Sequence, residues 1–488
     1  MSGVLFLFSI LICVLAAFAT LPALYALWLG NEGQAIDFAI LSGLGIFVGL
    51  SVYIALYGRK WRIGRVHSYL LLTISWLLLP LLGALPFLIV SDMPLGDAYF
   101  EAVSGFTTTG ASIVSDPSVL GQPILLWRSM LQWCGGLFTL LGIILILAPS
   151  GIGGLPDRHI KLIDQNEEGG GTRVLNTVRE VTSAYALFTG ICYLSLLLCG
   201  IDAFDALCLS LSTLSTGGFL PRAGDISSYQ NAAAEVVLIV FMLIGGTSIL
   251  WHRMLMQQRL QLLLKHRESY YVIGTAVLLG IVIAALLFRA AGSATVLSPL
   301  TALREGIFTA VSLVTTTGFE VRHDGFTVLP LTVILFVAFV GGGTFSTAGG
   351  LKHYRMGGMW VQATRELSRL IYPHGIRPAH FGSQPYDIQL MKSIWSYFAI
   401  AIFVIALGSL FLAMEDIDFE GALIATISSF ANLGTIYTPG WMHAQPAEWP
   451  ALTQMDNVSK LTLSFIMILG RLEILVLFAA LNRTYWTQ

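Results

Sequence analysis

The chain has 488 residues, of which 56% are hydrophobic and only 11% are charged, with a net charge of -2 and a mean hydropathy of +0.77. A soluble domain carries about twice that charged fraction, so the composition excludes a soluble globular protein and indicates a polytopic membrane protein. The sequence has no HExxH, Walker A or GxGxxG motif, which argues against a hydrolytic metal centre or a nucleotide site in this chain. We therefore expect no cofactor here.

Ten apolar segments follow one another, each long enough to cross a bilayer, which takes about 20 residues. We predict spans at residues 4–29, 37–57, 69–90, 124–148, 181–200, 231–252, 270–291, 327–347, 391–413 and 460–482. The first lacks the basic start of a secretory signal and stays apolar for too long, so we expect a retained helix. Basic residues cluster after the second, fourth, sixth and eighth spans, which predicts that both termini lie in the cytoplasm.

Four short stretches containing glycine lie between these spans, at residues 107–110, 215–218, 315–318 and 432–435. Aligned on Gly110, Gly217, Gly318 and Gly434, they are 107, 101 and 116 residues apart, so the chain repeats a unit of about a hundred residues four times. We divide the chain into two N-terminal spans and four repeats, at residues 1–66, 67–160, 161–260, 261–380 and 381–488.

A short, partly apolar helix is predicted before each glycine stretch, at residues 97–106, 205–214, 302–314 and 419–431. These helices are too short to span a bilayer, so each should dip in and return where protein or a water-filled cavity covers its backbone. Carbonyls gathered on one axis replace the water shell of a potassium ion, and glycine permits the φ > 0 that such turns need. The sequence thus predicts an all-α integral membrane protein with four inbound helix–pore loop–outbound helix repeats around a pseudo-fourfold pore.

The predicted selectivity filter consists of the residues around the four glycines, and its backbone carbonyls would bind potassium. The residues are Thr108, Thr109, Gly110, Ser215, Thr216, Gly217, Thr316, Thr317, Gly318, Asn432, Leu433 and Gly434. A glycine that merely caps a helix is common in any single case, but four at one spacing disfavour that alternative. The outer acids Asp97, Glu101, Asp205, Glu305 and Glu320 are expected to enrich cations near the entrance.

The motifs then point to a family. Residues 104–111, SGFTTTGA, resemble the first filter of the Trk/Ktr/HKT superfamily of potassium transporters. Residues 132–136 with 151–154, and residues 241–246, resemble the outbound helices of repeats one and two. Residues 349–352 and 470–473 resemble those of repeats three and four. The two extra N-terminal spans resemble the bacterial TrkH branch rather than the eight-span KtrB branch.

This resemblance implies a homodimer in the bacterial cytoplasmic membrane, with one pore per chain, regulated by a cytoplasmic nucleotide-binding subunit of the TrkA type. In the family, glycine at all four filter positions accompanies potassium and serine at the first accompanies sodium, so we expect potassium and rubidium to pass in preference to sodium. A sodium- or proton-coupled potassium symporter, or a sodium-permeable relative, is the alternative. Thr435 stands where relatives often have proline, a departure that affects local rigidity. No nucleic acid partner is expected.

A glycine-rich segment within the eighth span is the predicted gate. It comprises Gly341, Gly342, Gly343, Thr344, Ser346, Thr347, Gly349 and Gly350. Glycine costs about 1 kcal/mol per helical residue relative to alanine, so the helix should break here, and the exposed backbone must lie inside the bundle. The family's intramembrane gating loop occupies such a position. The alternative is a helix that ends at the membrane surface.

Arg471 lies within the apolar run 461–481, where a charge near mid-bilayer costs at least ~2.5 kcal/mol. Either it lines the pore and repels permeating cations, or it forms a structural ion pair with an acid of a neighbouring helix. Glu473 projects from another helix face and is not an obvious partner.

Two other functions are disfavoured, and one cytoplasmic segment has two possible interpretations. An intramembrane enzyme is disfavoured because no pair of buried carboxylates or Ser/His arrangement supports it, and a non-conducting scaffold is disfavoured by the intact glycines. Residues 353–371 carry apolar side chains among basic ones, which predicts either a helix lying on the membrane surface or a face for a cytoplasmic partner.

Overall fold

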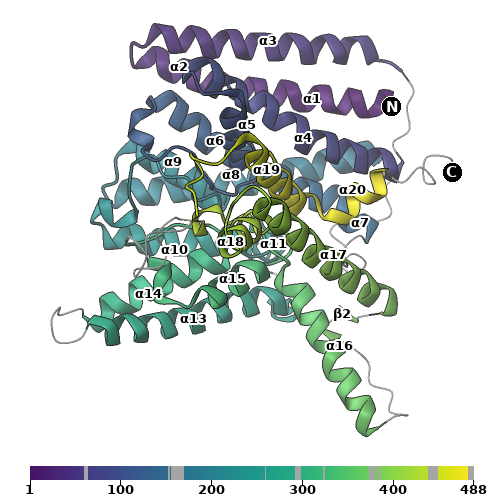
Figure 1. Ribbon diagram of the computed structural model, residues 1–488. Coiled ribbons are helices and arrows are strands. Elements are labelled where there is room, and N and C mark those ends of the chain that lie inside the picture. The colour runs from purple at the N-terminus through teal and green to yellow at the C-terminus, as the bar shows by residue number, and fades with distance from the viewer. Residues whose placement is uncertain are drawn as a thin grey trace.

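The computed structural model describes the chain except for residues 60–63, 152–153, 155–169, 259, 292–297, 323–324, 373–379, 382–383, 386, 438–448 and 482–488. Helices make up almost all of the regular structure of the described residues (Figure 1). The exception is one two-stranded antiparallel pair, β1 (His380–Phe381) with β2 (Gln384–Pro385). The expectation of an all-α architecture is confirmed.

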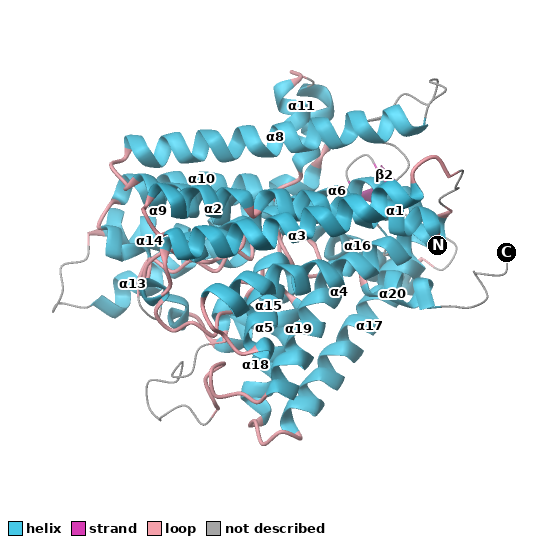
Figure 2. Ribbon diagram, turned by 90° about the horizontal axis from the view of Figure 1, so that it is seen from above, coloured by secondary structure: helices cyan, strands magenta, loops and turns pink. Residues whose placement is uncertain are grey.

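The N-terminal helices form a hairpin at the edge of the molecule. Helices α1 (Ser2–Phe18) and α2 (Thr20–Trp28) run almost continuously, and α3 (Glu32–Leu56) returns alongside them (Figures 1 and 2). The side chain of Asn31 caps α3 by accepting a hydrogen bond from the backbone N–H of Gln34. The hairpin packs on α4 (Arg65–Val90), the first helix of repeat one. The four repeats form the rest of the bundle.

Each repeat is built from an inbound helix, a short helix and an outbound helix. They are α4 (Arg65–Val90), α5 (Leu95–Phe106) and α6 (Gln122–Gly142); α8 (Gly170–Leu198), α9 (Ala203–Leu214) and α10 (Ala232–Gly246); α13 (Arg267–Ala291), α14 (Pro299–Val314) and α15 (Leu331–Val340); and α17 (Ile388–Ala413), α18 (Phe419–Phe430) and α19 (Asn457–Leu472). The short helices α5, α9, α14 and α18 are those that the sequence predicted.

The remaining elements connect or extend these units. They are η1 (Pro117–Val119), η2 (Ile143–Leu147), α7 (Ala148–Ser150), η4 (Ile226–Tyr229), α11 (Ile249–Met256), α12 (Leu260–Lys265), η5 (Gly325–Val328), α16 (His353–Ile371), η6 (Gly434–Ile436) and α20 (Ile474–Leu481). Helix α16 projects away from the bundle (Figure 1). It coincides with the predicted segment 353–371.

Three of the ten predicted spans do not run straight, although seven helices in the described chain are long and apolar enough to cross a membrane. Helix α10 meets α11 at 104° and α19 meets α20 at 93°, while α15 has only ten residues. The breaks occur where the backbone leaves helical geometry, with φ +67° at Gly341 and +55° at Glu473. The end of α15 lies at the glycine-rich segment where the sequence predicted a break. The two bends were not predicted, because hydropathy continues across them.

Glycines on three outbound helices set the depth of the short helices. A β-carbon built on Gly135 would lie 1.7 Å from the carbonyl oxygen of Phe106, and one on Gly470 would lie 2.2 Å from that of Phe430. A β-carbon built on Gly245 would likewise lie 2.8 Å from the carbonyl oxygen of Leu214. Any larger residue would push the C-terminus of a short helix off its outbound helix, so these glycines hold the first, second and fourth turns in place.

Candidate functional site

The four turns share one backbone conformation. After each short helix a non-glycine residue adopts the left-handed region, namely Thr108, Thr216, Thr316 and Asn432, at φ +52° to +54°. The next residue then donates its N–H to a serine carbonyl of the short helix. These bonds run from Thr109 to Ser104, Gly217 to Ser212, Thr317 to Ser312 and Leu433 to Ser428, at 2.8–3.0 Å. The turns can therefore be aligned by geometry.

This alignment corrects the predicted register of the second turn. Gly217 is equivalent to Thr109, Thr317 and Leu433, and Gly218 is the counterpart of Gly110. Gly218 has φ +83°, close to the +76° of Gly110 and the +82° of Gly318. The three residues of the second turn that correspond to Thr108, Thr109 and Gly110 are thus Thr216, Gly217 and Gly218, and Ser215 belongs one step earlier. Two adjacent glycines hide the register in the sequence.

The turns close into a ring in the order one, two, three, four. A β-carbon on Gly110 would lie 2.3 Å from the Gly217 carbonyl oxygen, and one on Gly218 would lie 2.4 Å from that of Thr317. Similarly, a β-carbon on Gly318 would lie 2.2 Å from the hydroxyl oxygen of Thr435 in the fourth turn. The fourth turn meets the first because the Gly434 N–H donates to the Thr109 carbonyl at 2.7 Å. No side chain fits at the glycine positions, so the ring consists of backbone.

A cavity of about 440 Å³ lies against this ring. All four aligned glycines, Gly110, Gly218, Gly318 and Gly434, line it, together with Ser112 and other residues that follow the turns. Because the four turns border one hollow, they surround a common axis.

Hydroxyl and amide side chains brace the turns from behind. The Thr107 and Thr109 hydroxyls lie 2.7 Å apart, and those of Thr315 and Thr317 lie 2.8 Å apart. In the fourth turn Asn432 Nδ2 donates to the Thr109 hydroxyl at 2.9 Å and to the Met467 carbonyl at 3.0 Å. The fourth turn thus depends on an amide where the first and third use threonine pairs.

Basic side chains pair with four of the outer acids that were expected to enrich cations near the entrance, and this pairing reduces the negative charge that they present there. Glu101 pairs with Arg128 at 2.6 Å, Asp97 with Lys460 at 2.6 Å, Asp205 with Arg222, and Glu305 with Arg322 at 3.7 Å. Glu320 lines the cavity and accepts a hydrogen bond from the Gly325 N–H at 2.8 Å. Residues 323–324, which follow Glu320 in the chain, lie outside the described residues.

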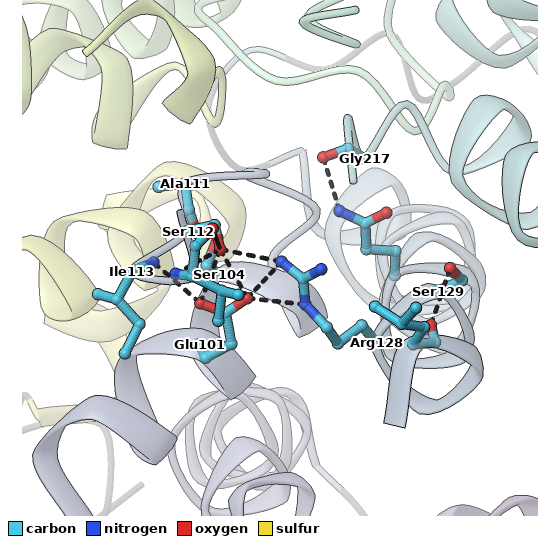
Figure 3. A network of polar contacts seen from close by, with 11 residues as sticks. Glu101, Ser104, Ala111, Ser112, Ile113, Arg128, Ser129 and Gly217 are labelled. Carbon is cyan, nitrogen blue, oxygen red and sulfur yellow. Dashed lines mark hydrogen bonds and ion pairs between the residues drawn. The ribbon is translucent and has the colours of Figure 1, made fainter. Parts of the chain in front are cut away.

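Glu101 and Arg128 form a buried network behind the first turn (Figure 3). Glu101 accepts hydrogen bonds from Arg128 Nε at 2.8 Å, from the Ser112 hydroxyl at 3.1 Å and from the Ile113 N–H at 3.1 Å. Sequence reasoning missed Arg128, although a charge inside the apolar segment 124–148 is the same signal that singled out Arg471. The network anchors the segment that follows the first turn, at Ser112 and Ile113.

The glycine-rich segment lies inside the bundle rather than at its surface. Residues 341–350 are all buried. The Gly343 N–H donates to the Gly246 carbonyl at 2.9 Å, and the Gly349 N–H donates to the Thr316 hydroxyl at 2.6 Å. Glu268 of α13 accepts from the Thr344 N–H at 2.6 Å and from its hydroxyl at 2.5 Å. The unwound backbone therefore finds its partners within the protein.

Arg471 joins this segment to the first turn. Its Nε donates to the Thr107 carbonyl at 2.6 Å and its Nη1 to the Thr347 carbonyl at 2.5 Å, while Nη2 contacts the Thr108 hydroxyl. These acceptors are uncharged, and within the described chain no carboxylate pairs with Arg471. Glu473 instead pairs with Arg355 of α16 at 2.5 Å. The alternative of a structural ion pair therefore does not describe Arg471.

No group of three or more histidine, cysteine or acidic side chains suited to a metal occurs among the described residues. The arrangement offers a bare cation main-chain oxygens and hydroxyls around an axis, with a positive charge on one side of the ring.

Comparisons with known proteins agree with this geometry. A family model described as TrkH, cation transport protein, matches residues 46–483. The chain is 28% identical over 489 residues to the Trk system potassium uptake protein TrkH of Escherichia coli (strain K12), covering 98% of each. It is 28% identical to the Trk system potassium uptake protein TrkI of Halomonas elongata, covering 98% of this chain and 96% of that protein.

A solved structure has the same fold. The crystal structure of the potassium transporter TrkH from Vibrio parahaemolyticus superimposes with a TM-score of 0.86 at 27% identity, covering 99% of both chains. The family resemblance predicted from the motifs is confirmed, and with it the interpretation as a transporter rather than an enzyme. The chain belongs to the TrkH family of cation transport proteins.

Proposed function

We propose that this chain takes up potassium across the bacterial cytoplasmic membrane through a single selective pore. The observation that carries the proposal is the closed ring of four backbone turns bordering one cavity of about 440 Å³. A ring of main-chain carbonyls can replace the hydration shell of a monovalent cation without any cofactor. The relatives with 28% identity are named potassium uptake proteins, which supports the choice of ion.

Selectivity tests this proposal directly. In the Gly110→Ser variant the new β-carbon would meet the Gly217 carbonyl oxygen, and φ +76° strains any side chain, so the ring must open on one side. We expect sodium permeation to rise relative to rubidium, measured as ²²Na⁺ and ⁸⁶Rb⁺ uptake into proteoliposomes. Gly190→Ser is the matched control, because a β-carbon there meets nothing within 4 Å. An unchanged ratio in Gly110→Ser would reject the assignment of the filter.

The proposed gate consists of residues 341–350 and Arg471. The segment contacts the third turn at Thr316, and Arg471 places a positive charge between the segment and the first turn. In this proposal the segment and Arg471 together oppose cation passage, and conduction requires them to move apart.

The assembly is part of the same proposal. The two N-terminal spans and the four repeats beginning at residues 67, 161, 261 and 381 form one pore per chain, both termini lie in the cytoplasm, and two chains associate. A nucleotide-binding regulator of the TrkA type acts from the cytoplasmic side. Helix α16 supports this because it exposes Trp360, Leu367 and Leu370, a face suited to a lipid surface or to a regulator.

Two measurements separate the remaining alternatives. Rubidium uptake with no sodium or proton gradient is expected if the pore conducts passively, whereas a coupled symporter would need the second ion. Mass determination in detergent, with and without added regulator, tests the dimer and its partner.

A further inference from the structure

The four turns differ at the position just before the ring glycine. Three carry a side chain there, Thr109, Thr317 and Leu433, whereas the second turn has Gly217. Gly217 does not adopt the left-handed region, so its backbone does not require glycine. Another feature of the structure must explain why no side chain stands at this position.

The space is filled by Gln132 of α6. A β-carbon built on Gly217 would lie 2.3 Å from Gln132 Cδ, 2.5 Å from Oε1 and 2.7 Å from Nε2. Gln132 is completely buried, and its Nε2 donates to the Gly217 carbonyl at 2.7 Å, the bond drawn to Gly217 in Figure 3. Repeat one therefore provides the side chain that the second turn lacks.

The amide is oriented by the filter itself. A carbonyl oxygen can only accept, so the NH₂ group of Gln132 must face Gly217. Its Oε1 is then buried, and no hydrogen-bond partner for it lies among the described residues. A buried oxygen without a partner is costly, and in native proteins such an oxygen calls for an explanation. Here the explanation is that the amide must turn its NH₂ group toward the Gly217 carbonyl.

The corresponding positions of the second and fourth outbound helices carry no amide. Gln132 precedes by three residues Gly135, the glycine that contacts the end of its short helix. Three residues before Gly245 and Gly470 lie Met242 and Met467, both buried. The amide is thus special to the junction between repeat one and the second turn.

We propose that Gln132 is a selectivity-positioning residue that pins the Gly217 peptide in the second turn. Two adjacent glycines, Gly217 and Gly218, give the second turn more intrinsic backbone freedom than the other turns have, because neither has a β-carbon to restrict it. The Gly217 carbonyl is confined between the Gln132 amide and Gly110. Fixing this peptide keeps the spacing of the ring, on which discrimination by ion size depends. This inference rests on the proposed function of the ring as a potassium filter.

The first test is Gln132→Met, which removes the donor and keeps the chain length found in Met242 and Met467. We expect rubidium uptake to persist and the rubidium-to-sodium uptake ratio to fall by about five- to tenfold, the equivalent of about 1–1.4 kcal/mol. Gln122→Met on the same helix is the control, because Gln122 contacts Tyr25 far from the turns. A correctly folded Gln132→Met protein with the original ratio would overturn the inference.

The second test exchanges the two side chains. Gly217→Thr alone is expected to abolish selective uptake, because the new side chain collides with Gln132. The double variant Gly217→Thr/Gln132→Ala is expected to recover it, because threonine occupies this position in turns one and three and the Ser215 hydroxyl is placed like that of Thr107. A double variant no better than Gly217→Thr contradicts the inference, and this comparison decides the matter if Gln132→Met does not fold.

Gly110→Ser distinguishes a failure of the filter assignment from a failure of the proposed role of Gln132. If Gly110→Ser alters the ion ratio and neither Gln132 experiment does, the filter stands and the role of Gln132 is wrong. If none of the variants alters the ratio, the assignment of these turns as the filter fails.

Discussion

Replacing Glu101 by glutamine distinguishes a buried brace from an acid that attracts cations. Glu101 is 0% exposed and Arg128 2% exposed. The neutral amide would leave the Arg128 charge buried without its counterion, although the guanidinium still stacks 4.1 Å from the Phe219 ring. Removing one partner of a buried ion pair typically costs about 3–5 kcal/mol. We expect Glu101→Gln to lose stability on that scale.

The assay is thermal inactivation in detergent, followed by size-exclusion chromatography, alongside rubidium uptake by the surviving protein. Replacing both partners, as Glu101→Gln/Arg128→Met, should recover most of the stability because no unpaired charge remains. The control is Glu366→Gln, whose ion pair with Arg369 is more than half exposed, so its loss should change little. A Glu101→Gln protein as stable as the parent, yet with reduced uptake at low cation concentration, would refute the brace and restore the role in cation attraction.

Three other perturbations follow from the contacts around the filter. A unit charge roughly 8 Å from a permeating ion opposes it by ~2 kcal/mol at an effective dielectric constant of about 20, so Arg471→Ala should raise rubidium uptake at least tenfold; equal or lower uptake by folded protein would contradict the barrier. Glu473→Gln removes the carboxylate that pairs with the buried Arg355 and should lower thermal stability by ~3 kcal/mol or more; an unchanged melting temperature would contradict the importance of this pair. Hydrogen bonds from Ser459 lower the pKa of Asp456, the N-cap of α19, below 3.8, so Asp456→Ala should cost ~1 kcal/mol at neutral pH, a deficit that shrinks as the pH falls below 4; a deficit independent of pH would exclude the carboxylate as its source.

The short helices and the turns could be predicted because their signals are local. A helix of about a dozen residues that ends in threonine and glycine cannot span a membrane, and the four predicted helices end within one residue of α5, α9, α14 and α18. The register of the second turn could not be predicted, because Gly217 and Gly218 are equally able to adopt φ > 0. Only the hydrogen-bond pattern of the folded chain distinguishes them.

The pairing of charges was the other limit. Hydropathy shows that Arg128, Glu101 and Arg471 lie in apolar surroundings, but not which acceptors meet them. Glu101 was predicted to face the entrance and instead lies behind the filter, held by a residue 27 positions away. Partners that distant in sequence come together only through the packing of α5 on α6, and no periodicity of a single segment reveals it.

The repeats are most alike at the ring and differ most beyond it, and ion conduction gives a reason for both. The four turns share φ angles and hydrogen bonds, as the proposed pore requires, because equivalent carbonyls would there surround one ion. Beyond the ring no such equivalence is needed: α6 continues nearly straight, α10 and α19 bend sharply, and α15 gives way to residues 341–350. One repeat can then supply the crossing segment and another the charge of Arg471. Under the proposed function, such a barrier can move by breaking its bonds to the surrounding helices and turns, among them those to Glu268, Gly246 and Thr316. The bond from the Gly434 N–H to the Thr109 carbonyl, which closes the ring, can meanwhile remain intact.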